Sequence, residues 1–290
     1  MKAVVVGAGA WGTAFAQLLR DRGHETTVVG RDDIDDAPYE DADLVAMAVP
    51  SRSFRDAVAH VRGSCPVLSL VKGLDPDTGH RLSTLVTDRP VAVLSGPNMA
   101  EEVAAGLPSA TVVASTDESL ALELQEAIHS LVFRVYVNSD PIGVELCGAA
   151  KNVIALAAGG VDGLGLGDNA KAAVLTRGLV EMSRLGEAYG ADPDTFAGLA
   201  GLGDLVVTCW HPSGRNRRAG ELIARGATAE EAKAQIGQVV EGLTTAPVLR
   251  DLSHRIGVEL PITEGVCSVL EGASLDGLLA SLMGRRPTEE

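Results

Sequence analysis

The sequence is poor in aromatic residues and in positive charge. Aromatic side chains make up 3% of its 290 residues, and 24 Lys and Arg stand against 39 Asp and Glu, which gives a formal net charge of -15. Nucleic-acid binding requires clustered positive charge to neutralise phosphates and aromatic rings on which bases stack. We therefore expect no nucleic-acid partner, and the same net charge disfavours an anionic membrane surface.

Long apolar runs are also missing. A helix that crosses a membrane needs roughly 20 consecutive apolar residues, whereas the most apolar stretch, 153–161, contains two glycines and runs into Asp162. No signal-peptide pattern precedes the strand-like run that starts at Ala3. These absences predict a cytoplasmic protein with no membrane insertion.

Cysteine is scarce and scattered. Neither a CxxC nor an HExxH pattern occurs, and the four cysteines are far apart, at Cys65, Cys147, Cys209 and Cys267. We expect no metal site and no disulfide framework, and we interpret the cysteines as small buried apolar residues.

The chain does contain enough apolar material for a core, at 46% hydrophobic residues. Up to about residue 144, short apolar runs alternate with helical stretches such as 12–22 and 118–131, which favours a parallel sheet covered by helices. The expected strands are 3–6, 26–29, 44–49, 67–71, 91–94, 111–114 and 133–137. This alternation predicts a doubly wound, Rossmann-like dinucleotide-binding domain over residues 1–144.

Beyond about residue 145 no strand-like run occurs. The helical stretches there are 170–189, 213–225, 244–255 and 262–270, so we predict an all-helical domain over residues 145–290. No low-complexity linker separates the two halves. We therefore expect the domains to pack together, with the chemistry in a cleft between them.

A glycine-rich loop follows the first expected strand. Residues 7–12 read Gly-Ala-Gly-Ala-Trp-Gly, which is G-x-G-x-x-G between a strand and a helix. In this context Gly7 permits the turn, Gly9 lets the backbone approach a pyrophosphate and Gly12 allows close helix packing. The unpaired N–H groups of the helix start would bind the phosphates, so the motif predicts a dinucleotide site.

The end of the second strand leaves the choice of dinucleotide open. It reads Gly30-Arg31-Asp32. Arg31 can face the 2'-phosphate of NADP, whereas Asp32 or Asp33 can serve the ribose hydroxyls of NAD. We therefore expect NAD or NADP.

Lysine is rare, with five in the chain, so its positions carry information. Lys72 lies in Val71-Lys72-Gly73, and Lys151 lies in an apolar stretch, 147–153. A dehydrogenase that reduces a carbonyl must supply a proton to the oxygen, and a partly desolvated lysine with a lowered pKa suits that task. Lys151 is the candidate acid/base.

A later segment combines glycines, an acid and a basic cluster. Residues 201–209 read GLGDLVVTC, and residues 213–218 read SGRNRR. Arg side chains bind a phosphate dianion in a forked geometry, to which Asn216 can add a donor. The cluster therefore indicates a phosphorylated substrate, although a solvated basic helix face remains the alternative.

Taken together, these motifs resemble the NAD(P)-dependent sn-glycerol-3-phosphate dehydrogenase family. The shared elements, in order over nearly the whole chain, are GAGAWG, VKG, SGPN at 95–98, CGAAKNV, GLGDLVVTC, SGRNR and QVVEG at 238–242. The resemblance implies reversible reduction of dihydroxyacetone phosphate to sn-glycerol 3-phosphate.

The resemblance also implies roles for individual residues. Lys151 would be the general acid/base, Lys72 would orient and polarise the carbonyl, and Asp204 would belong to the same catalytic group. The implied cofactor-binding residues are Gly7, Gly9, Ala10, Trp11, Gly12, Arg31, Lys72, Ala100, Arg215, Val239 and Glu241. The implied substrate-binding residues are Lys72, Gly96, Asn98, Lys151, Asn152, Asp204, Thr208, Gly214, Arg215 and Asn216.

Two departures from the family stand out. The stretch between the second and third strands, 31–43, is shorter than usual, so we expect a helix and part of the adenine-side wall to be missing. Gly214 occupies a position where the family commonly has Ser, so one phosphate hydrogen bond is either lost or supplied by Ser213.

Two other functions are compatible with the sequence. One is a non-catalytic dinucleotide sensor, and the other is a dehydrogenase of a small hydroxy acid or pantoate-like alcohol. A homodimer is compatible with a helical domain of this kind.

Overall fold

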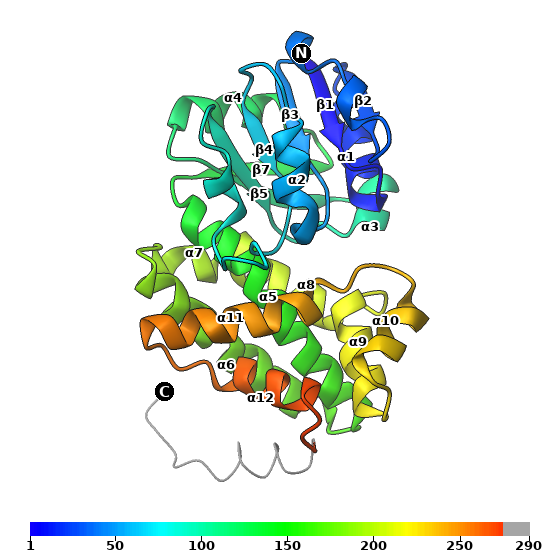
Figure 1. The fold of residues 1–290 in the computed structure, drawn as a ribbon, viewed down its shortest axis with the longest axis vertical. Coiled ribbons are helices and arrows are strands. Elements are labelled where there is room, and N and C mark those ends of the chain that lie inside the picture. Colours follow the sequence, from blue (N-terminus) through cyan, green and yellow to red (C-terminus); the bar gives the residue numbers. More distant parts are fainter. Residues whose placement is uncertain (275–290) are drawn as a thin grey trace.

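The computed structural model describes residues 1–274, and the first half of the chain forms a sheet (Figure 1). Its strands are β1 (Lys2–Val6), β2 (Glu25–Val29), β3 (Leu44–Met47), β4 (Val67–Ser69), β5 (Val91–Ser95), β6 (Ser109–Ala114) and β7 (Phe133–Asn138). They lie in the order β2-β1-β3-β4-β5-β6-β7. All seven expected strands are confirmed, with ends that differ by at most two residues.

The direction of the last two strands differs from the expected parallel sheet. Strands β1 to β5 are parallel, but β6 runs antiparallel to β5, and β7 is parallel to β6. Only the short helix α3 (Ala100–Ala104) lies between β5 and β6. The chain therefore turns back at one end of the sheet, because it lacks the long crossover helix that a parallel connection normally uses.

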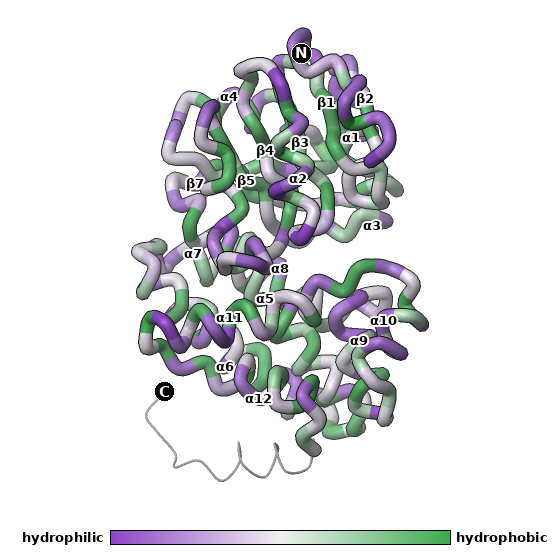
Figure 2. Tube along the Cα trace, in the orientation of Figure 1, coloured by the Kyte–Doolittle hydropathy of each residue, from purple (hydrophilic) through white to green (hydrophobic). Residues whose placement is uncertain are grey.

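Helices and turns cover both faces of the sheet. One face packs against α1 (Ala10–Asp21) and α4 (Glu118–Ile128). The other packs against α2 (Phe54–Ala59) and the 3-10 turns around Tyr39 and Leu82. Successive strand residues point to opposite faces, so Val5 joins the first cluster while Val4 and Val6 join the second. Figure 2 shows the predominance of hydrophobic residues along the strands of the sheet.

The second half of the described chain is helical. Its helices are α5 (Pro141–Gly163), α6 (Gly167–Ala188), α7 (Pro193–Ala197), η5 (Leu199–Gly203), α8 (Asp204–Trp210), α9 (Arg215–Ala224), α10 (Ala229–Ile236), α11 (Glu241–Ile256) and α12 (Pro261–Leu270). The four helices predicted from periodicity correspond to α6, α9, α11 and α12. The sequence patterns did not identify α5 as one long helix. It is apolar almost all round, so it has no polar stripe.

Helix α5 is the centre of the helical part, with α6, α8, α9 and α11 packed around it (Figure 1). It passes a test of length and hydropathy for a membrane-crossing helix, with 23 residues and a mean hydropathy of 1.4 in its most apolar window. That window is 89% buried inside the protein. Packing within the core accounts for its apolar composition.

Glycines bring α9 onto α5 at very short range. A Cβ atom on Gly159 would lie 1.8 Å from the carbonyl oxygen of Arg217, and one on Gly220 would lie 1.9 Å from that of Leu156. Side chains at these positions would force the two helices apart. The approach places the start of α9 beside the middle of α5, where Lys151 lies.

Candidate active site

The glycine-rich loop lies where the strand order reverses, between β1 and β3. Gly7 follows β1 with φ of +119°, and a Cβ there would lie 2.5 Å from the carbonyl oxygen of Ala48. A Cβ on Gly12 would lie 2.0 Å from the carbonyl oxygen of Gly7. Beside Gly9, by contrast, the Cβ position is open. Such a crevice at the carboxyl ends of parallel strands is the usual ligand site of a doubly wound sheet.

The residues around this loop fit a dinucleotide. Gly9 caps α1 through its backbone only, so no side chain occupies the N–H groups of the first turn. Ala10 is exposed, and Trp11 packs against Phe15. The buried Nε1 of Trp11 has no hydrogen-bond partner among the described residues. The loop thus offers unpaired donors beside open space, as phosphate binding requires.

The adenine side is built without a helix between β2 and β3. The segment forms two 3-10 turns, η1 (Ile34–Asp36) and η2 (Tyr39–Asp41), as expected from its shortness. Asp35 pairs there with His60, at 2.7 Å from its Nδ1. Arg31 and Asp32 are exposed and have no polar partner among the described residues. Both remain available to a ribose or to its phosphate.

Two lysines and one aspartate meet where the sheet joins the helical part. Nζ of Lys72, just after β4, lies 2.7 Å from Oδ2 of Asp204, and Nζ of Lys151, on α5, lies 2.5 Å from Oδ1 of the same carboxylate. Lys151 is 5% exposed and Asp204 1%. Three segments distant in sequence thus form one ion cluster, consisting of residues 72, 151 and 204.

Burial and charge shift the pKa values in this cluster. Burial lowers the pKa of Lys151 to about 7, with a further lowering from Lys72, and Asp204 only partly opposes the shift. Burial alone would raise the pKa of Asp204, but the two lysines outweigh it and the net shift is downward. The cluster therefore holds a permanent carboxylate and an amine that titrates near neutral pH.

Local structure explains why Asp204 points into the cluster. The segment Leu199–Gly203, which ends in the GLG of the motif, forms η5, a single turn of π-helix that leads into α8, and Asp204 is the first residue of α8. A Cβ on Gly201 would lie 2.1 Å from the carbonyl oxygen of Phe196, so this turn needs glycine. One turn later, Thr208 Oγ1 accepts a hydrogen bond from Lys151 at 2.9 Å.

Two asparagines link the cluster to the rest of the site. Asn152 donates to the carbonyl oxygen of Lys72 at 3.0 Å, and Asn216 donates to Oδ1 of Asn152 at 2.8 Å. The backbone N–H of Gly242 donates to Oδ1 of Asn216 at 2.9 Å. The chain of bonds joins the loop of Lys72 to α5, α9 and α11. Both amides are thus already engaged by the protein.

The SGPN segment forms the turn after β5. Gly96 has φ of +154°, and its carbonyl oxygen accepts from Lys72 at 2.8 Å. Asn98 donates to the carbonyl oxygen of Ala110 at 3.0 Å and accepts from Thr111 at 2.9 Å. Ala100, partly exposed, begins α3. The turn holds Lys72 and presents α3 toward the helical part.

The basic segment divides between exposed and paired arginines. Arg215 is the first residue of α9 and is exposed, as is Arg218. Arg217 is paired with Asp162 at 3.1 Å and with Glu221 at 2.9 Å.

The loop before α9 has little free space. A Cβ on Gly214 would lie 2.9 Å from the carbonyl oxygen of Thr208, which leaves little room for Ser. Ser213 donates to Glu101 at 2.5 Å.

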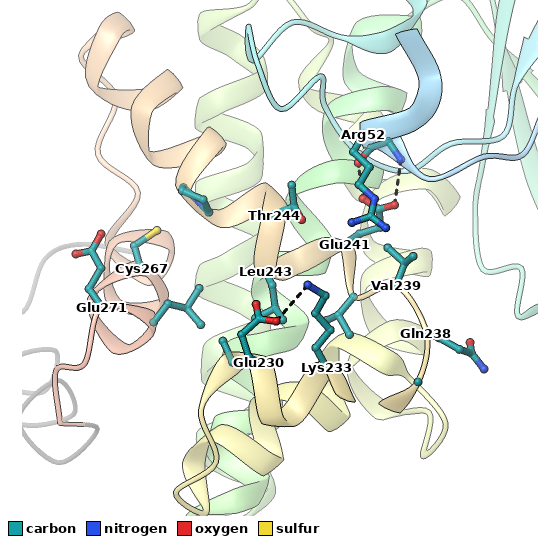
Figure 3. Close-up of a pocket in the computed structure, with 16 residues that line it drawn as sticks. Arg52, Glu230, Lys233, Gln238, Val239, Glu241, Leu243, Thr244, Cys267 and Glu271 are labelled. Atoms are coloured by element: carbon teal, nitrogen blue, oxygen red, sulfur yellow. Dashed lines mark hydrogen bonds and ion pairs between the residues drawn. The ribbon is translucent and has the colours of Figure 1, made fainter. Parts of the chain in front are cut away.

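A cavity of about 580 Å³ lies beside Val239 and Glu241 (Figure 3). Glu241 begins α11 and accepts from the backbone N–H of Ser51 at 3.1 Å and from its hydroxyl at 2.5 Å. The cavity extends between α10, α11 and α12, where Lys233 and Glu230 line it. Neither lysine of the ion cluster lines this cavity, so it is adjacent to the candidate reaction site and not part of it.

Sequence reasoning missed two serines that complete these contacts. Ser51 follows β3 in the chain and bonds Glu241, and Ser95 Oγ lies 3.5 Å from Oδ2 of Asp204. Ser95 is the first residue of the quoted SGPN motif, so the motif itself was a signal. Ser51 had none, because its partner is 190 residues away.

Comparison with known families covers nearly the whole chain. The C-terminal model of NAD-dependent glycerol-3-phosphate dehydrogenase matches residues 140–276, and the N-terminal model matches residues 2–38 and 26–121. A glycerol-3-phosphate dehydrogenase [NAD(P)+] of Salmonella paratyphi B is 43% identical over 326 aligned positions, covering 99% of this chain and 96% of the relative.

Solved structures agree with this match. The glycerol-3-phosphate dehydrogenase of Coxiella burnetii has a TM-score of 0.92 at 35% identity, covering 98% of this chain and 99% of that one. A ketopantoate reductase of Ralstonia eutropha has a TM-score of 0.60 at 16% identity, covering 93% of this chain and 97% of that one. The second likeness shows a shared fold alone.

Proposed function

The chain belongs to the NAD-dependent glycerol-3-phosphate dehydrogenase family, and we propose from this membership and from the ion cluster that it reversibly reduces dihydroxyacetone phosphate to sn-glycerol 3-phosphate. NAD or NADP is the cofactor of this reaction. The observation that carries the proposal is the ion cluster itself, in which the buried amine of Lys151 shares the carboxylate of Asp204 with Lys72.

Lys151 is the proposed general acid/base. In reduction, its ammonium donates a proton to the carbonyl oxygen as the carbon accepts a hydride, and solvent then reprotonates the amine. In oxidation, the neutral amine takes the proton of the hydroxyl. An acid/base works best when its pKa is near the working pH, and burial brings the pKa of Lys151 to about 7.

Lys72 and Asp204 are proposed to prepare Lys151 and the substrate. Lys72 donates to Asp204 and to the carbonyl oxygen of Gly96, so its position is fixed from both sides. Its positive charge would polarise the substrate carbonyl. The carboxylate of Asp204 holds both amines within 2.7 Å, which fixes the separation of the two nitrogens.

Arg215 is proposed to bind the substrate phosphate. It is exposed at the first position of a ten-residue helix, where backbone N–H groups and the helix dipole also favour an anion. Asn216 bonds Asn152, the neighbour of Lys151, and so ties the phosphate end of the site to the reacting end. Gly96, Asn98, Thr208 and Gly214, named from the resemblance, complete the proposed substrate-binding set.

The dinucleotide, when bound, supplies or accepts the hydride. Gly7, Gly9, Ala10, Trp11 and Gly12 would hold its pyrophosphate, and Arg31 would lie at the adenosine ribose. Lys72, Ala100, Arg215, Val239 and Glu241 complete the proposed cofactor set. The open space beside Gly9 and the unpaired Nε1 of Trp11 support this placement.

We propose a division into two domains, residues 1–144 and 145–290, with the boundary close to the start of α5 at Pro141. Residues 275–290 of the second domain lie outside the described residues. A cytoplasmic location remains a proposal, supported by four unpaired cysteines, of which three are buried. The homodimer also remains a proposal.

The deciding experiment is an assay of NADH and NADPH oxidation with dihydroxyacetone phosphate. Turnover is expected, and folded protein without turnover with either cofactor would contradict the proposal. Tight dinucleotide binding without turnover would favour the sensor. A panel including ketopantoate and other 2-keto acids tests the remaining alternative, because those substrates carry a carboxylate in place of the phosphate.

A further inference from the structure

We propose that Glu101 is a positioning residue, which holds the loop before Arg215 in the arrangement that binds the substrate phosphate. The proposal rests on the function proposed above and adds a residue that none of the sequence motifs contains. Glu101 lies on α3 in the sheet-bearing half, whereas its partners lie between α8 and α9 in the helical half.

The contact joins α3 of the sheet-bearing half to the loop between α8 and α9 of the helical half. Ser213 Oγ donates to Oε1 of Glu101 at 2.5 Å. His211 lies next to the same helix, with Nδ1 3.6 Å from Oε1 of Glu101 and Nε2 3.5 Å from Oε1 of Glu102. The bond from Ser213 is the only one of these with hydrogen-bond geometry, so Glu101 carries the contact.

Chain connectivity places this contact beside the proposed phosphate site on one side and beside the proposed cofactor set on the other. Ser213 is two residues before Arg215, and Glu101 follows Ala100 directly. Arg215 itself has no polar partner among the described residues, so its position depends on the loop that precedes it. The bond to Glu101 is the shortest contact between this loop and α3 of the sheet-bearing half.

The loop is packed tightly enough to transmit a displacement. The space at Gly214 is closed by the carbonyl oxygens of Thr208 and His211, at 2.9 and 3.1 Å from its Cβ position. Thr208 in turn contacts Lys151. A shift of Ser213 therefore moves the start of α9 relative to the ion cluster, which changes the distance between the phosphate site and the reacting end.

Charge and position predict opposite effects, and this makes the proposal testable. Glu101 is an anion near the site of a dianionic substrate. If it acted only through its charge, its removal would relieve repulsion and lower the KM for dihydroxyacetone phosphate. If it positions the loop, its removal raises that KM.

The test compares Glu101→Ala with Glu101→Gln, which loses the charge but keeps an oxygen that accepts from Ser213. We expect Glu101→Ala to raise the KM for dihydroxyacetone phosphate about threefold to tenfold, with kcat and the KM for the dinucleotide nearly unchanged. Glu101→Gln should stay close to the wild type. Glu102→Ala, which removes the neighbouring charge but not the bond, is the matched control and should not raise the KM.

A second variant removes the other partner of the bond. Ser213→Ala should raise the same KM as Glu101→Ala does, and the double variant should raise it no further. With dihydroxyacetone, which has no phosphate, the variants should match the wild type. An unchanged or lowered KM in Glu101→Ala, or full additivity in the double variant, would overturn the proposal. A wild-type protein without turnover would instead overturn the proposed function, and this inference with it.

Discussion

Lys151 and Asp204 are 53 residues apart in sequence, yet their Nζ and Oδ1 atoms lie 2.5 Å apart in the core. Both side chains are almost fully buried, so water cannot screen either charge. The carboxylate keeps part of the positive charge on an amine that burial would otherwise neutralise. This balance makes the amine both a proton donor and a proton acceptor near neutral pH.

The first prediction concerns the amine. Lys151→Met should lower kcat by about a thousandfold or more, because the variant lacks the amine that donates the proton to the carbonyl oxygen. Dinucleotide binding, followed by fluorescence titration with NADH, should be nearly unchanged. Lys171→Met is the matched control, because Lys171 is equally buried but belongs to a different ion pair. Its Nζ lies 2.8 Å from Oδ2 of Asp162. If the Lys151 variant kept most of its activity, the acid/base role would be wrong.

The second prediction concerns pH. Reduction needs the protonated amine, so kcat/KM for dihydroxyacetone phosphate should fall as pH rises through the Lys151 pKa of about 7. For oxidation of glycerol 3-phosphate, which needs the neutral amine, kcat/KM should rise through the same pH. Asp204 raises the pKa of Lys151, so Asp204→Asn should move the midpoint to lower pH and reduce activity.

A control is needed because burial also raises the pKa of Glu181 to about 7. Glu181 accepts from the backbone N–H of Thr263 at the start of α12, outside the ion cluster. Glu181→Gln should therefore leave the midpoint of the rate profile where it is. A midpoint that moves in Glu181→Gln and not in Asp204→Asn would assign the inflection to Glu181 and contradict the prediction.

The third prediction concerns the phosphate. Arg215→Ala should raise the KM for dihydroxyacetone phosphate roughly 30-fold, because a charge-assisted contact to a dianion is lost. This factor corresponds to about 2 kcal/mol of binding free energy. Arg218→Ala changes an exposed arginine on the same helix and should have little effect. Equal KM values for the two variants would place the phosphate site elsewhere.

The fourth prediction concerns the choice of cofactor. Arg31→Ala should raise the KM for NADPH severalfold more than the KM for NADH, because only NADPH has a 2'-phosphate for the guanidinium to contact. Arg22→Ala removes an exposed arginine at the end of α1, away from the end of β2, and serves as the control. An equal change for both cofactors would show that Arg31 does not read the 2'-phosphate.

Local patterns predicted much of the fold. The apolar runs gave all seven strands, because a strand buried on both faces needs a continuous apolar segment. The glycine motif predicted the loop after β1, because the nearby backbone leaves no room for a Cβ atom at Gly7 or Gly12. The antiparallel β6 was not predictable in this way, because strand direction depends on the connection and not on the strand's own residues.

The candidate site was only partly predictable. Lys72, Lys151 and Asp204 could be selected by residue type and by their apolar surroundings, but no local pattern reveals that one carboxylate serves both amines. The bonds of Glu241 to Ser51 and of Ser213 to Glu101 also join segments from the two halves of the chain. The spacing of residues in the sequence does not predict such contacts, because each side chain bonds a partner more than 100 residues away.

The sequence by itself determined the elements, the glycine loop and the short list of residues able to donate a proton or bind a phosphate. Only the tertiary structure decided which of them meet and what their environment does to them. Burial depends on everything that packs around a group, and the pKa of Lys151 follows from burial and from the charges beside it. The sequence could therefore name Lys151 as a candidate acid/base, but only the folded chain shows the burial and the neighbouring charges that lower its pKa.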